Sequence, residues 1–100
     1  MAGTLGPVPP GEILKEEFLD PLGISAYALA KILRVPTNRI TGIVNGERSV
    51  TADTALRLSR YFGTTPDFWL NLQTHFDLQV TARADAARIE REVPRRTAKG

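Results

Sequence analysis

The residues best suited to chemistry lie between positions 37 and 48, and their types favour recognition of nucleic acid. Thr37, Asn38 and Thr41 carry short hydrogen-bonding groups on the outer side of a predicted helix, and such groups can reach base edges in a major groove. We therefore predict base contacts from these three residues. Four further residues are candidates for contacts with DNA phosphates: Ser25, Arg39, Asn45 and Arg48.

Catalytic and metal-binding constellations are missing from the sequence. It contains no cysteine and a single histidine, His75, so thiol chemistry and thiolate metal sites are excluded. Glu16 and Glu17 are adjacent on a predicted helix, so their carboxylates point in different directions. No glycine-rich phosphate loop or nucleophile elbow is present. We predict a protein that is not an enzyme and uses neither a metal nor a cofactor.

The charge is unevenly distributed along the chain. The formal net charge is only +2, but residues 25–60 hold six basic and two acidic side chains. Residues 82–100 hold six basic and three acidic side chains, while residues 1–24 and 61–81 are acidic. A localised basic patch suggests a polyanionic partner. A solvated face with clustered charge is the alternative explanation.

Helical signals recur along the chain, with proline and glycine between them. Ser25, Thr51 and Thr65 are good N-cap residues, and Gly63 is a typical C-terminal stop. Pro21 and Gly23 are expected to end the first helix. No segment alternates for long enough to make a convincing strand. The predicted helices cover residues 12–20, 26–33, 36–45, 52–62 and 66–80, with a possible surface helix at 82–92. The fold class is therefore all-α, with five helices.

Residues 25–46 have the spacing of a helix-turn-helix. Two short helices are joined by about three residues, and the second ends at Asn45-Gly46. Ala30 falls where the two helices cross closely. Ile40 and Ile43 attach the second helix to the core, which leaves the polar residues named above on its outer face. This motif coincides with the basic segment, and the two signals together predict DNA binding.

The chain divides into three parts in this interpretation. Residues 1–9 form an N-terminal arm, residues 10–80 form the DNA-binding domain, and residues 81–100 form a basic C-terminal extension that is partly helical or disordered. The length of 100 residues suits one domain. The start lacks a signal peptide pattern, and no apolar run is long enough to span a bilayer. We expect a cytoplasmic protein without a membrane partner.

The last predicted helix carries an apolar stripe that is large for so small a core. Phe68, Leu72 and Phe76 are four residues apart, with Trp69 beside them. A stripe left in water would promote aggregation, and a single helix-turn-helix of this size makes too few contacts for specific binding. We predict that these four residues form a homodimer interface, so that two copies bind one palindromic operator in double-stranded DNA.

The sequence resembles the HigA family of antitoxins, within the larger group of phage-repressor-like helix-turn-helix regulators. The resemblance covers about residues 10–78, and its most specific stretches are residues 10–19, 51–58 and 62–72. It implies a transcriptional repressor of its own toxin–antitoxin operon. It also implies that the protein binds and neutralises a HigB-type toxin, a ribonuclease that cuts messenger RNA.

The sequence is also compatible with two other functions. One is a stand-alone repressor without a toxin partner, and the other is a protein-interaction module that no longer reads DNA. The sequence also departs from the resemblance at one position. Arg34 occupies the turn, where glycine is frequent in this group because the backbone there is left-handed. We expect either a different turn or tolerated strain.

Overall fold

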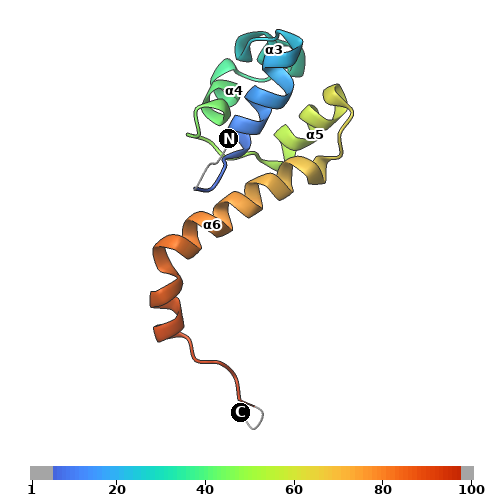
Figure 1. Ribbon diagram of the computed structural model, residues 1–100. Helices are drawn as coiled ribbons and strands as arrows, with labels where there is room; N and C mark the ends of the chain where they lie inside the picture. Colours follow the sequence, from blue (N-terminus) through green and yellow to red (C-terminus); the bar gives the residue numbers. More distant parts are fainter. Residues whose placement is uncertain (1–5, 98–100) are drawn as a thin grey trace.

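The fold is entirely helical in the part of the chain that the computed structural model describes, residues 6–97 (Figure 1). The prediction of an all-α, five-helix domain is confirmed. A first helix is built from three consecutive stretches, and four separate helices follow it. The elements are α1 (Pro10–Ile13), η1 (Leu14–Leu19), α2 (Asp20–Leu22), α3 (Ala26–Leu33), α4 (Thr37–Val44), α5 (Ala52–Phe62) and α6 (Pro66–Glu92).

The first helix runs without interruption from Pro10 to Leu22. Of the two residues predicted to end it, Gly23 does so and Pro21 does not. In the middle stretch, η1, the helix widens to a π-helical register, and the backbone N–H of Asp20 bonds to the carbonyl of Lys15, five residues earlier. A proline ring would clash with the carbonyl four residues before it in a regular α-helix. The wider turn relieves that clash. The helix ends at Gly23, whose φ is +67°.

Side-chain caps begin three of the helices, as the sequence predicts. The Ser25 hydroxyl accepts a bond from the Ala28 N–H at 3.0 Å, and the Thr65 hydroxyl accepts one from Phe68 at 3.1 Å. Thr51 caps α5 in the same way. These bonds satisfy donors that lack intrahelical partners. Helix α4 begins at Thr37, one position later than predicted, so Pro36 is its N-cap residue rather than its first residue.

The core is closed by Trp69 of α6. Its side chain is fully buried, and its ring centroid lies 5.0 Å from that of Phe18. The indole N–H donates to the Thr64 hydroxyl at 2.8 Å, so the buried polar atom is satisfied. The buried aliphatic side chains around it include Leu14, Leu29, Ala30, Ile40, Ile43 and Leu58 from the other helices.

Helix α6 is a single helix of 27 residues, so the expected interruption near residue 81 does not occur. Its second half leaves the body of the molecule (Figure 1), and between residues 77 and 97 Asp85 is the only residue that is not exposed. Arg88 bonds to Asp85 at 3.2 Å and to Glu92 at 3.1 Å. Such pairs and the many alanines support a helix that has little tertiary packing.

The predicted boundary between domain and extension therefore falls inside a continuous helix. Part of the predicted N-terminal arm, residues 1–5, and the last three residues of the extension lie outside the described residues. Within residues 6–97, no helix combines the length and the apolarity that a membrane span requires.

The close approach of the first helix to α4 gives a stability prediction. A side chain at buried Gly11 would overlap the carbonyl oxygen of Ile43. We expect Gly11→Ala to lower the free energy of unfolding by about 1–3 kcal/mol, because the backbones must move apart. Gly6→Ala is the control, since nothing lies within 4 Å of its Cβ position. Urea denaturation measures both, and equal stability of the two variants would contradict the close packing.

Candidate nucleic-acid interface

The turn between α3 and α4 contains a left-handed arginine. Arg34 has φ 61° and ψ 47°, and its N–H and that of Val35 donate to the carbonyls of Lys31 and Ala30 at the end of α3. The glycine-like conformation is thus retained with a side chain present, at a cost of roughly 1 kcal/mol. Of the two outcomes expected from the sequence, the structure has the strained one, and Arg34 is exposed.

The three predicted base-contact residues lie on α4. Asn38 is exposed, and within residues 6–97 its side chain makes no hydrogen bond. Thr37 and Thr41 are half-buried, and the Thr41 hydroxyl donates to the Thr37 carbonyl at 3.2 Å. That bond uses the hydroxyl proton but leaves lone pairs on the Thr41 oxygen. Asn38 therefore presents both donors and acceptors to a ligand, whereas Thr41 presents chiefly an acceptor.

Arg39 is held by a carboxylate that sequence reasoning did not connect to it. Oδ2 of Asp53, in the first turn of α5, accepts from Arg39 at 2.6 Å and from Arg57 at 2.9 Å. Arg57 also donates to the Leu33 carbonyl at the end of α3, at 2.9 Å. One network thus joins α3, α4 and α5. It orients Arg39, but it also offers that arginine a competing anion.

Arginine contacts lower the pKa of the Asp53 carboxyl below its ordinary value of 3.8. The hydrogen bond from Arg57 is the main cause, desolvation partly opposes it, and Arg39 lowers the pKa further. Because the folded-state value lies below the unfolded one, this network stabilises the fold above about pH 3.8. That contribution is lost as the pH falls through the lowered pKa.

Arg39 and Arg48 meet at a cleft of about 340 Å³, which we call the arginine cleft. The aliphatic stem of Arg48 lies across buried Gly42, where a Cβ would come within 2.7 Å of Cγ and Cδ. Gly42 therefore makes room for Arg48 in the folded chain. The cleft is lined by Arg39, Arg48, Ser49, Thr51 and Thr54.

The arginine cleft brings two of the predicted phosphate-contact residues together, and two others lie elsewhere. Ser25 is at the start of α3 and Asn45 is at the end of α4; both are exposed and neither lines the cleft. Ser49 and Thr51, which add hydroxyl groups to the cleft, were not predicted as ligand contacts. Thr51 was recognised only as a helix cap, because a cap is readable from local sequence and a tertiary cleft is not.

Gln73 is a second residue that the sequence analysis missed. Its side chain is buried, its oxygen accepts the Val50 N–H at 2.8 Å, and its nitrogen donates to Asp77 at 2.9 Å. It ties α6 to the segment that carries Arg48. The sequence does contain a signal for this role, because Gln73 is a polar amide four residues after Trp69 and so lies on the same face of the predicted helix.

The predicted dimer interface needs one correction. Trp69 is completely buried within a single chain, so it has no surface to offer a partner. It was included because spacing alone does not distinguish a core stripe from an interface stripe. Phe68 is 37% exposed, and Leu72 and Phe76 are half-buried. These three residues keep accessible surface.

Comparison with known proteins identifies the family. Residues 14–69 match the helix-turn-helix family. A HigA-family addiction module antidote protein from Coxiella burnetii is 52% identical, with a TM-score of 0.87 over 92% of this chain and 100% of that one. The protein belongs to the HigA family of helix-turn-helix regulators.

Two other relatives extend this comparison. Antitoxin HigA of Pseudomonas aeruginosa, solved with the higBA promoter, is 43% identical, with a TM-score of 0.86 over 88% of this chain and 96% of that one. Virulence-associated protein I of Dichelobacter nodosus is 54% identical over 85% of this chain and 78% of its own length. Its family makes this HigA-type protein a DNA-binding regulator rather than an enzyme. Within residues 6–97 no cluster of His, Asp and Glu could hold a metal ion.

Base recognition by Asn38 can be tested by removing its side-chain amide. A bidentate base contact contributes about 1–3 kcal/mol, so Asn38→Ala should weaken operator binding by that amount and leave binding to unrelated DNA unchanged. Asn71→Ala, at an exposed position of α6, is the matched control. Fluorescence anisotropy with both DNAs measures the difference. Equal operator affinity of Asn38→Ala and the parent protein would remove Asn38 from the interface.

Because Asp53 competes with DNA for Arg39, removal of its charge is expected to strengthen DNA binding rather than weaken it. Asp53→Asn removes the anion that Arg39 contacts, so affinity for DNA should rise roughly threefold at low salt, and the gain should shrink as salt screens it. Asp67→Asn is the control, because Asp67 is also an exposed first-turn aspartate, whereas the carboxylate that binds Arg39 is that of Asp53. A fall in affinity of Asp53→Asn would mean that Asp53 positions Arg39 more than it competes for it.

Proposed function

We propose that this protein represses transcription by reading an operator with the outer face of α4. The observation that carries the proposal is the combination of Asn38, whose side chain makes no hydrogen bond within residues 6–97, with two arginines lining one cleft beside the same helix. The first offers base recognition and the second offers phosphate binding, which together fix a protein on DNA. The promoter-bound HigA of Pseudomonas aeruginosa supports this reading.

The repressor acts as a homodimer on a palindromic site in this proposal. Phe68, Leu72 and Phe76 supply apolar surface next to the body. The second half of α6 carries further exposed aliphatic side chains, including Val80 at 43% and Ile89 at 43%. Pairing these surfaces across a two-fold axis would remove them from water. It would also set two α4 helices at half-sites about 34 Å apart.

We further propose that the protein is the antitoxin of a type II system, acting in the cytoplasm. It would repress its own operon and bind a HigB-type messenger-RNA-cleaving toxin. Relatives described as an addiction module antidote and as an antitoxin support this. A stand-alone repressor is the second candidate, favoured by 49% identity, over 75% of this chain and 70% of the other, to a Haemophilus influenzae protein described as an HTH-type transcriptional regulator.

Two measurements test these proposals separately. Binding to a DNA fragment from the protein's own promoter, against a scrambled fragment of equal length, tests repression. Co-expression with the adjacent open reading frame tests neutralisation, since growth arrest by that product should be relieved by this protein. Promoter binding without a toxic neighbour would favour the stand-alone repressor. Failure to prefer the promoter over scrambled DNA would contradict sequence-specific repression.

Truncation of α6 tests the dimer. The full chain should be a dimer at micromolar concentration, and a chain cut after Val93 should remain one, because residues 94–100 add almost no apolar surface. A chain cut after Asp77 keeps Trp69 and the Gln73–Asp77 bond but loses the projecting half of α6, and it should become a monomer. A cut after Thr64 removes Trp69 and should unfold the chain. Light scattering and circular dichroism follow the four proteins; a dimer that survives the cut after Asp77 would confine the interface to the body.

A further inference from the structure

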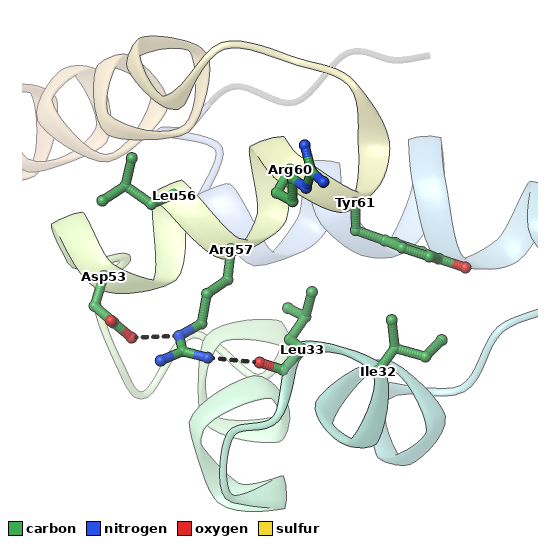
Figure 2. A pocket seen from close by; sticks show the side chains of 7 residues that line it. All are labelled: Ile32, Leu33, Asp53, Leu56, Arg57, Arg60 and Tyr61. Carbon is green, nitrogen blue, oxygen red and sulfur yellow. Dashed lines mark hydrogen bonds and ion pairs between the residues drawn. The ribbon is translucent and has the colours of Figure 1, made fainter.

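A groove between α3 and α5 has no role in the proposals above. It has a volume of about 510 Å³ and is lined by Ile32 and Leu33 of α3 and by residues of α5 (Figure 2). Tyr61 extends from α5 over Ile32, and Leu56 stands at the other end. Leu56 is 59% exposed, and Ile32 and Tyr61 are each 44% exposed. Large apolar side chains from two helices thus gather at one exposed place.

The core does not need these side chains. Helix α5 buries Ala55 and Leu58 on its inner side, while Leu56 lies on the opposite side. A cluster of exposed apolar side chains marks an interaction surface more often than a single one does. Tyrosine and arginine, which both line this groove, are the residue types enriched in the centres of protein interfaces.

The charges of the groove define the chemistry of its partner. Arg57 and Arg60 line it, and Asp53 is its one carboxylate. Asp53 and the Leu33 carbonyl bond to Arg57, whereas Arg60 has no bonded partner within residues 6–97. The groove therefore combines apolar walls with an unneutralised guanidinium. Its complement is an apolar side chain beside a carboxylate.

We propose that the α3–α5 groove docks a segment of a partner protein that presents leucine-like side chains next to a carboxylate. Docking in the groove also affects α4, through Arg39. A carboxylate that binds Arg57 and Arg60 draws Arg57 away from Asp53. Asp53 is then left with Arg39 alone, 2.6 Å away, and it holds that arginine more strongly. Occupation of the groove consequently weakens binding to DNA, and this last step rests on the proposed repressor function.

The test uses the full-length, nitrogen-15-labelled protein and two peptides. The first is an amphipathic peptide of about 14 residues with leucines on one face flanked by glutamates, and the second replaces every glutamate with glutamine. We expect the acidic peptide to shift the amide resonances of Ile32, Leu56, Arg57 and Tyr61, and to bind at least fivefold more tightly than its twin. Arg60→Gln should abolish that preference, whereas Arg91→Gln, at an exposed position of α6, should retain it.

Three results would overturn the proposal. Equal binding of the two peptides would show that charge does not select the partner, and shifts confined to α6 would place the site elsewhere. Shifts of the groove resonances on simple dilution, without peptide, would make a second copy of this chain the occupant.

The predicted effect of groove occupation on DNA binding can be measured separately. A saturating amount of the acidic peptide should weaken DNA binding about threefold in the parent protein and leave Asp53→Asn unaffected, because that variant lacks the shared carboxylate. If the protein binds no DNA at all, the repressor proposal fails. The amide resonance shifts would still show whether the acidic peptide docks in the α3–α5 groove. Unchanged DNA affinity in a peptide-saturated parent protein would disprove the coupling.

Discussion

Burial of Trp69 is the constraint on which the rest of the structure depends. The indole closes a core to which the first helix contributes Phe18 and α5 contributes Phe62, with ring centroids of 5.0 and 6.4 Å from its own. A side chain of this size contributes several kcal/mol when it is fully buried. One turn further along α6, Gln73 bonds to Val50. The same helix face therefore completes the core and fixes the segment that leads from α4 to α5.

Electrostatics at the interface depend on one carboxylate shared between two arginines. Asp53 accepts from Arg57 and from Arg39, and Arg57 also caps the end of α3. Exposed ion pairs of this kind add little stability on their own. Their effect here is on geometry, because they connect the three helices that a DNA duplex would meet. The charge of this one aspartate thus acts both on the helix-turn-helix and on Arg39, which is proposed to contact phosphate.

Local signals allowed most of the fold to be predicted from the sequence. Ser25, Thr51 and Thr65 cap helices through residues three positions away, so their effect is readable within one turn. The first helix was predicted too short because Pro21 stops only a regular α-helix, and a π-helical turn accommodates it. The predicted break in α6 failed for a similar reason, since the ion pairs of Arg88 support the helix where packing ends.

The candidate site was less predictable, because its parts are distant in sequence. The composition of α4 indicates which residues face outward, but nothing near Arg39 shows that Asp53, fourteen residues later, will bind it. The apolar stripe of α6 shows a related limit. Periodicity identified Phe68, Trp69, Leu72 and Phe76 as one group, yet only the tertiary structure separates the buried tryptophan from its more exposed neighbours.

The projecting half of α6 is already folded in the single chain, which bears on the proposed homodimer. A helix that folds only on contact with its partner loses backbone conformational entropy at that moment, at a cost of about 1–2 kcal/mol for each residue. Residues 78–92 are already helical in the single chain, supported by alanines and by the pairs of Arg88. Their aliphatic side chains are therefore held in register before any contact forms. Preorganisation of this kind lets a modest apolar surface support association.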